Sequence, residues 1–141
     1  PRHIQAARRY VEMHTPYGRG AGELVCGTLI TAVAKQVGTP LRMIDPGADS
    51  HDTTLAKFQA EAGLRDRPLL SPTLGALAFF RPVSGQPLSE DYWHVGLVDA
   101  DARGAHWLIH ACPACGVVRR EALLPHRPFD WCLAGFAGWP A

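Results

Sequence analysis

The segment that decides the fold is residues 94–111, which read HVGLVDADARGAHWLIHA. Two short runs of alternating apolar residues flank a polar stretch that contains Asp101 and Gly104. Runs of this kind, bounded by turn-forming residues, are typical of two antiparallel strands joined as a hairpin. We therefore predict a β-hairpin whose loop extends from Asp99 to Ala105.

The hairpin relates two histidines, one in each strand. We take Val98 to face His106 across the loop. With this register His94 falls opposite His110, because each step back on one strand matches a step forward on the other, and the two Cβ atoms would lie about 4.5–5.5 Å apart. A register shift of two residues would keep both histidines on one face of the sheet, whereas a shift of one would separate them.

The N-terminal part of the chain has helical periodicity. Residues 2–13 predict an amphipathic helix, and a second helix begins near Cys26 and ends at Gly38, which suits a left-handed C-terminal cap. A long surface loop at 39–53 and a short helix from about Leu55 to Ala62 are expected next. Further strands are predicted at 75–80, 116–119 and 133–136. Helices followed by strands indicate an α+β fold, with N-terminal helices packed on a mainly antiparallel sheet, and a single domain spanning 1–141.

Composition and charge exclude several classes of function. Hydrophobic residues make up 47% of the chain, and 14 basic against 13 acidic residues give a net charge of +1. This balance argues against disorder and against electrostatic binding of nucleic acid. No apolar run approaches the roughly 18 residues of a membrane span, so we expect a soluble protein. The first residues lack a charged leader with an apolar core, so we expect synthesis in the cytoplasm without a signal peptide.

Cys26 is the candidate nucleophile. The backbone N–H groups and the positive dipole end of a helix N-terminus stabilise a thiolate and can donate to an oxyanion. His94 would take the thiol proton, and His110 would fix the tautomer of His94 and support its positive charge. The alternative is that Cys26 is a small buried hydrophobe, which is the commoner fate of a free cysteine. The three placements together favour a cysteine hydrolase.

The same residues carry a resemblance to a known family. The segments TPYG (15–18), GALAFF (75–80), HVGL (94–97), IHA (109–111) and GV (116–117), with Cys26 opening a helix, resemble the NlpC-type cysteine peptidases in order and approximate spacing. The ending LAGF (133–136) and the absence of a leader resemble the phage-tail and gene-transfer-agent branch of that family. The resemblance covers nearly the whole chain from Ile4 onward.

The resemblance implies a papain-like fold and hydrolysis of peptide bonds in bacterial peptidoglycan, in stem peptides near γ-D-glutamate. Cys26 would be the nucleophile, His94 the general base and His110 the third, orienting residue. Tyr17 matches the family tyrosine that lies beside the nucleophile and helps to bind the substrate carbonyl. Trp93, directly before His94, is a candidate for lining the substrate groove or for packing at its rim. No cofactor is implied.

The chain departs from the family around the nucleophile. Members usually have Asp-Cys-Ser-Gly, whereas this chain has Val25-Cys26-Gly27-Thr28, and Ala76 stands where many members have aspartate. Val25 and Gly27 beside the thiol motivate a second hypothesis, a non-catalytic structural or binding module of a phage-tail-like assembly. Under either hypothesis we expect the protein to act in the periplasm or cell wall after delivery. The expected partners are peptidoglycan stem peptides, a phage-tail or secretion assembly, and a cognate immunity protein.

Cys112 and Cys115 provide a competing signal. Two cysteines at this spacing, just after His110, can bind zinc and stabilise a domain. Cys132, His106 or His126 would be the fourth ligand. The same pair can also form a local disulfide or take part in redox exchange. If zinc recruited His110, that side chain would be lost to catalysis, so the two hypotheses compete.

Other polar residues are expected to be solvated. His3, His14, His51 and His126 lie in polar or terminal stretches. The run Arg119-Arg120-Glu121 is interpreted as the solvated end of a strand, with contact to an acidic stem peptide as the alternative.

Overall fold

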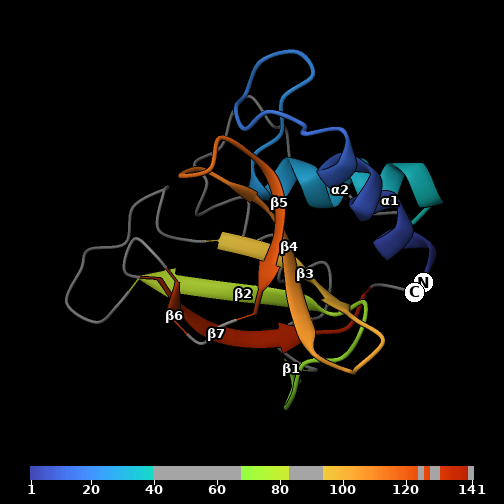
Figure 1. Ribbon diagram of the computed structural model, residues 1–141, viewed down its shortest axis with the longest axis vertical. Coiled ribbons are helices and arrows are strands. Elements are labelled where there is room, and N and C mark those ends of the chain that lie inside the picture. Colours follow the sequence, from blue (N-terminus) through green and yellow to red (C-terminus); the bar gives the residue numbers. More distant parts are fainter. Residues whose placement is uncertain (40–67, 83–93, 124–125, 128–130, 140–141) are drawn as a thin grey trace.

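The computed structural model describes residues 1–39, 68–82, 94–123, 126–127 and 131–139. Two helices, α1 (Arg2–Glu12) and α2 (Cys26–Val37), precede the strands. Both helices lie on one side of an antiparallel sheet and contact it (Figure 1). The predicted α+β class, with N-terminal helices packed on a mainly antiparallel sheet, is confirmed.

The sheet has five longer strands and two strands of two residues each. The longer ones are β2 (Leu77–Pro82), β3 (His94–Ala100), β4 (His106–Cys112), β5 (Val117–Ala122) and β7 (Trp131–Ala137), and the short ones are β1 (Pro68–Leu69) and β6 (His126–Arg127). The order is β1-β7-β2-β3-β4-β5, with β6 paired to β7. All five longer strands overlap predicted segments, whereas β1 and β6 are too short to give a periodic pattern.

Helix α2 begins and ends where the sequence predicts. The Thr28 hydroxyl accepts a hydrogen bond from the Val25 N–H at 2.8 Å, which satisfies a backbone donor at the helix start and places Cys26 in the first turn. At the other end Gly38 has φ of 76°, a left-handed conformation that glycine adopts without strain. The short-range chemistry of this segment therefore fixes the position of the cysteine.

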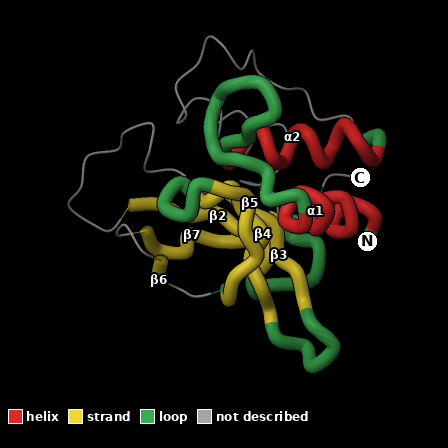
Figure 2. The backbone as a smooth tube through the Cα atoms, turned by 45° about the horizontal axis from the view of Figure 1, so that its top comes forward, coloured by secondary structure: helices red, strands yellow, loops and turns green. Residues whose placement is uncertain are grey.

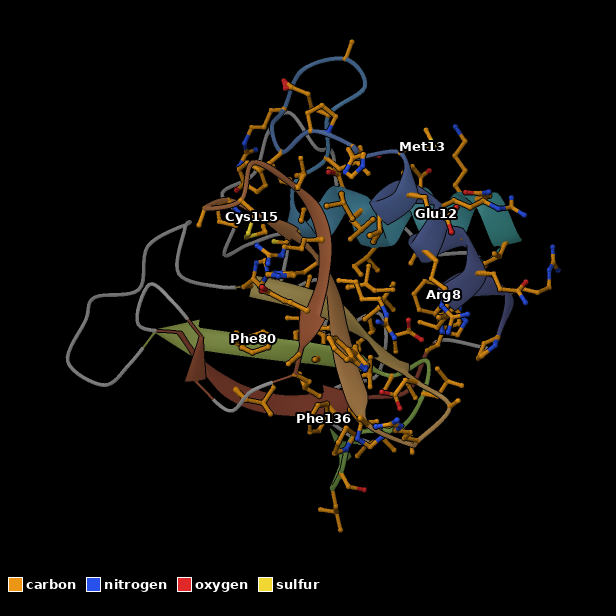
Figure 3. The ribbon with its side chains drawn as sticks, viewed as in Figure 1. Arg8, Glu12, Met13, Phe80, Cys115 and Phe136 are labelled. Atoms are coloured by element: carbon orange, nitrogen blue, oxygen red, sulfur yellow. A yellow bond between two sulfur atoms is a disulfide. The ribbon has the colours of Figure 1, made fainter. Side chains whose placement is uncertain are left out.

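The two faces of the sheet carry separate apolar clusters. The cluster toward the helices contains Val95, Leu97 and Ile109 together with Cys26. The cluster on the opposite face includes Phe80, with Phe136 packed against it; both are labelled in Figure 3. Because successive strand residues point to opposite faces, the histidines of β3 and β4 lie on the face away from the helices.

The register of the β3–β4 hairpin differs from the predicted one. Val98 pairs with Leu108 rather than with His106, which is a shift of two residues. Both strands are also longer than predicted, so the loop shortens to 101–105 and extends beyond the sheet (Figure 2). A shift of two preserves the face of every side chain, and His94 and His110 therefore still share one face.

Several predictions fall outside the described residues. They are the loop at 39–53 apart from Thr39, the helix at 55–62, and Trp93. No helix in the described ranges is long and apolar enough to cross a membrane.

Candidate active site

Three buried or partly buried side chains form a chain of hydrogen bonds across β3, β4 and β5. His94 Nε2 lies 2.6 Å from His110 Nδ1. His110 Nε2 lies 2.7 Å from Glu121 Oε1. Both histidines are 2% exposed, so these bonds form in a water-poor environment where they are strong. The structure thus brings the two predicted histidines together and adds a carboxylate behind them.

The carboxylate determines which ring nitrogens carry protons. An ionised Glu121 only accepts hydrogen bonds, so His110 Nε2 must donate to it. Nδ1 of a neutral His110 is then an acceptor, and His94 Nε2 must donate to that atom. In this arrangement Nδ1 is the basic nitrogen of His94. A proton taken up at that atom would be stabilised through His110 by the negative charge of Glu121.

Glu121 is the functional candidate that sequence reasoning missed. Its segment was expected to be a solvated strand end, but Glu121 pairs with Leu108 in the β4–β5 ladder and faces the same side as His110. The signal was present in the sequence. The turn at Gly116 pairs Cys112 with Val117, so two residues further along each strand His110 pairs with Arg119. Glu121 lies two residues beyond Arg119, and it is therefore the diagonal neighbour of His110 on the same face.

The thiol of Cys26 lies at the start of β3. The Val95 N–H hydrogen-bonds to it, and Val95 follows His94 directly. The N–H and C=O of Val98 both bond to residues just before β2, at 2.8 Å each, so the backbone groups of Val95 point toward β4. Pairing of β3 with β4 begins only at Leu97, which leaves the Val95 amide to the cysteine. The thiol lies on the helix side of β3, whereas the imidazoles of His94 and His110 project from the opposite face of the sheet.

The protonation state of Cys26 differs from the expected thiolate. Burial raises the pKa of this thiol to about 12, against the opposing effect of the Val95 and Gly27 backbone groups and of the positive charge of Arg19. The side chain is 2% exposed and packs in the helix-facing cluster. The thiol is therefore protonated at neutral pH in this structure, because desolvation outweighs the helix N-terminus.

Gly96 permits the close approach of the two histidine strands. A Cβ atom at this position would lie 2.5 Å from Leu108 Cδ1 and 2.8 Å from the Ile109 carbonyl oxygen. It would also lie 3.1 Å from the Cβ of His110. Any larger residue would therefore push β4 away from β3 at the point where the imidazoles meet.

Tyr17 belongs to the same part of the molecule as the thiol. Its N–H donates to the Gly116 carbonyl at 2.8 Å, and it forms an isolated bridge with Leu24, two residues before Cys26. The partly buried ring packs against the cluster that contains Cys26. Trp93, the other predicted substrate contact, lies outside the described residues.

Cys112 and Cys115 form a disulfide in the turn between β4 and β5, where Figure 3 labels Cys115. Among the alternatives left open by the sequence, the local disulfide is therefore the one that this structure contains. Of the further zinc ligands considered, His106 lies at the opposite end of β4 from Cys112. The side chains of Cys132 and His126 lie outside the described part of the chain.

One group of metal-ligand side chains does converge beside the disulfide. The ligand atoms of His110, Cys112 and Glu121 lie within 4.8 Å of one another. This set shares His110 and Glu121 with the hydrogen-bonded chain, and it differs from the set that the sequence suggested, because it includes Glu121 and lacks Cys115.

Comparison of the chain with protein-family models, with curated proteins and with solved structures finds no match. The resemblance to NlpC-type peptidases therefore depends on the sequence motifs alone.

Proposed function

We propose that the protein is a thiol hydrolase that cleaves peptide bonds in peptidoglycan stem peptides. The observation that carries this proposal is the hydrogen-bonded chain from Glu121 through His110 to His94, the residue directly before Val95, whose N–H bonds to the Cys26 thiol. A chain of this kind holds a neutral imidazole in the tautomer that accepts a proton. The papain-like form of the fold and the site near γ-D-glutamate come from the sequence resemblance and belong to the same proposal.

The reaction starts from a neutral thiol rather than from a preformed ion pair. As Sγ of Cys26 bonds to the substrate carbonyl carbon, its proton passes to Nδ1 of His94. His94 then protonates the leaving amine, and the carbon–nitrogen bond breaks. Water attacks the resulting thioester, giving one proton to His94, which returns it to the sulfur. The Gly27 N–H at the start of α2 is the candidate donor to the oxyanion.

The setting of the thiol suits an acidic peptide. Arg19 is exposed, and its positive charge opposes the rise in the pKa of the Cys26 thiol. The γ-linked glutamate of a stem peptide carries a free α-carboxylate, which is a natural partner for a guanidinium group. The disulfide fits action in an oxidising compartment such as the periplasm, after delivery by a phage-tail or secretion assembly. An immunity protein that covers the site would protect the producing cell.

The second candidate is a non-catalytic binding module of such an assembly. The buried, protonated state of Cys26 is the observation that favours it, since an inert structural cysteine has the same properties.

Digestion of purified peptidoglycan, with fragments identified by mass spectrometry, separates the two candidates. We expect new stem-peptide fragments from the wild type and none from Cys26→Ala. His106→Gln is the matched control, because it removes a histidine from the far end of the strand that carries His110. Binding of peptidoglycan without fragments, by folded protein with a reduced Cys26, would instead support the binding module.

A further inference from the structure

Three side chains with different metal-ligand atoms meet at the end of β4 and β5 that carries the disulfide. His110 and Cys112 are separated by one residue on β4 and therefore share a face, and Glu121 reaches them from β5. Their ligand atoms lie within 4.8 Å of one another, with His110 and Cys112 buried and Glu121 partly buried. Imidazole nitrogen, thiolate sulfur and carboxylate oxygen are the three ligand types that Zn²⁺ takes in proteins.

In the oxidised protein the Cys112–Cys115 disulfide prevents these three side chains from binding a metal ion together. The sulfur of Cys112 is bonded to Cys115, and a disulfide sulfur is not the thiolate that binds zinc. Hydrogen-bond donors around the two sulfur atoms favour the reduced cysteines once they form. The Cys115 N–H donates to Cys112 Sγ at 3.1 Å, and an Arg119 N–H donates to Cys115 Sγ at 3.4 Å. Donors of this kind stabilise thiolates, and a stabilised thiolate leaves a disulfide faster.

We propose that reduction of the Cys112–Cys115 disulfide opens a Zn²⁺ site formed by Cys112, His110 and Glu121. A phosphine or dithiol reductant supplies two electrons. With a phosphine, one water provides the oxygen of the phosphine oxide and the protons of the two thiols. Zn²⁺ then displaces the proton of the Cys112 thiol and binds its sulfur, Nε2 of His110 and a carboxylate oxygen of Glu121. Three protein ligands leave one tetrahedral position for water.

Metal binding at this site would reverse the direction of the hydrogen bond between His110 and His94. A zinc-bound Nε2 of His110 carries no proton, so its proton must be on Nδ1, which then donates to His94 Nε2. The proton of His94 moves to its own Nδ1, and that nitrogen can no longer accept the thiol proton of Cys26. Zinc and catalysis would therefore be alternative states of one site. The metal site itself does not depend on the proposed hydrolase function, whereas the inhibition does.

The test uses Co²⁺ as the probe and two variants that both lack the disulfide. Cys115→Ser retains the Cys112 thiol, whereas Cys112→Ser removes it. Both variants keep Cys26 and Cys132, so cobalt binding by those residues is equal in the two proteins. We expect Cys115→Ser to bind one equivalent of Co²⁺ with thiolate-to-metal absorption, without added reductant, and Cys112→Ser to show none of this absorption. Circular dichroism establishes that each variant is folded.

The wild type provides a second measurement in case a variant fails to fold. Oxidised protein should show no thiolate-to-cobalt absorption, and protein reduced with a phosphine and then desalted should show it. Glu121→Gln should weaken Co²⁺ binding by the reduced protein at least about tenfold. Equal absorption by Cys112→Ser and Cys115→Ser, or no difference between oxidised and reduced wild type, would overturn the proposed site.

Inhibition is tested with Zn²⁺ on wall-peptide cleavage. We expect Zn²⁺ to suppress cleavage by Cys115→Ser and to leave the oxidised wild type unaffected. Undiminished cleavage by the zinc-loaded variant would overturn the reversal of the chain. If no form cleaves peptidoglycan, the hydrolase proposal fails, and the cobalt titration still decides the metal site.

Discussion

Two buried polar networks connect the same strands on opposite faces of the sheet. On the helix side, the Asp99 carboxylate of β3 binds Arg8 of α1 at 2.6 and 3.0 Å and Arg120 of β5 at 2.8 Å. On the other side, His94, His110 and Glu121 form the chain described above. The adjacent residues Arg120 and Glu121 serve different networks because successive strand residues point to opposite faces.

The two networks differ in whether their hydrogen-bond donors can release a proton. Every donor in the Asp99 network is an arginine or a backbone amide, and neither gives up a proton at ordinary pH, so the network can only hold α1 on the sheet. The histidine network contains two imidazoles, a group that can both donate and accept a proton, and His94 directly precedes Val95, whose N–H bonds to the Cys26 thiol. Burial of charge by itself therefore does not make a network a candidate for catalysis, and the presence of imidazoles is what distinguishes the histidine network from the Asp99 network.

The largest expected effect is on catalysis, from His94→Gln. Loss of the base should lower kcat/KM for wall-peptide cleavage by about 10²–10⁴-fold. Thermal unfolding followed by circular dichroism should change little, because glutamine can still hydrogen-bond to His110. Retention of full activity would remove His94 from the mechanism.

Asp99→Asn should have the opposite profile. The substitution removes the charge that two arginines bind, and we expect the free energy of unfolding to fall by about 2 kcal/mol, with cleavage retained by the folded fraction. The arginines limit the loss, because their side chains are 44% and 31% exposed and can reach water. Urea denaturation of Asp99→Asn, Arg8→Met and the double variant measures the coupling between the two residues.

The same variant should also lose part of its acid sensitivity. Burial alone would raise the pKa of Asp99, but the hydrogen bonds from Arg8 and Arg120 outweigh it and lower the pKa below 3.8. The stabilisation is thus present above that value and is lost as pH falls through the folded-state pKa. An equal acid dependence in Asp99→Asn would contradict this role.

Gly96→Ala tests the close approach of β3 and β4. The added methyl group would clash with Leu108 and the Ile109 carbonyl, so we expect a loss of about 1–3 kcal/mol in unfolding free energy and reduced cleavage. Gly135→Ala is the matched control, because it also lies in a strand and its added Cβ has nothing within 4 Å. Equal effects of the two substitutions would show that the strand spacing at Gly96 is unimportant.

Glu121→Gln should have the smallest effect of the series. Replacing a charged acceptor by a neutral amide weakens one hydrogen bond to His110 by about 1.5 kcal/mol, which corresponds to roughly a tenfold loss in kcat/KM. The control is Glu12→Gln at the exposed end of α1, labelled in Figure 3. A loss as large as that of His94→Gln would mean that Glu121 takes a more direct part in the reaction.

Local patterns predicted much of this architecture. Helical periodicity predicts a helix that begins near Cys26, and Gly38 predicts its end; α2 has both limits. The shared face of His94 and His110 survived an error of two residues in the register, because the side-chain period of a strand is two.

Long-range contacts explain what the sequence did not predict. Asp99 was expected in the hairpin loop but lies in β3, where its carboxylate binds Arg8, 91 residues away in the chain. His3 was expected to be solvated, yet it bonds to the Gly75 carbonyl at 2.8 Å and stacks on Trp139. The state of Cys26 depends on how completely the core covers it, and a helix pattern contains no information on that covering.

The central claim is that His94 is held in the tautomer that accepts a proton at Nδ1. Long-range ¹H–¹⁵N correlation spectra of uniformly ¹⁵N-labelled, oxidised protein report directly on which ring nitrogen is protonated, with spectra of His94→Gln and His110→Gln providing the assignments. We predict that, in their neutral forms, both His94 and His110 carry the proton on Nε2. A proton on Nδ1 of neutral His94 would contradict the account, because that nitrogen could not take the proton of the Cys26 thiol.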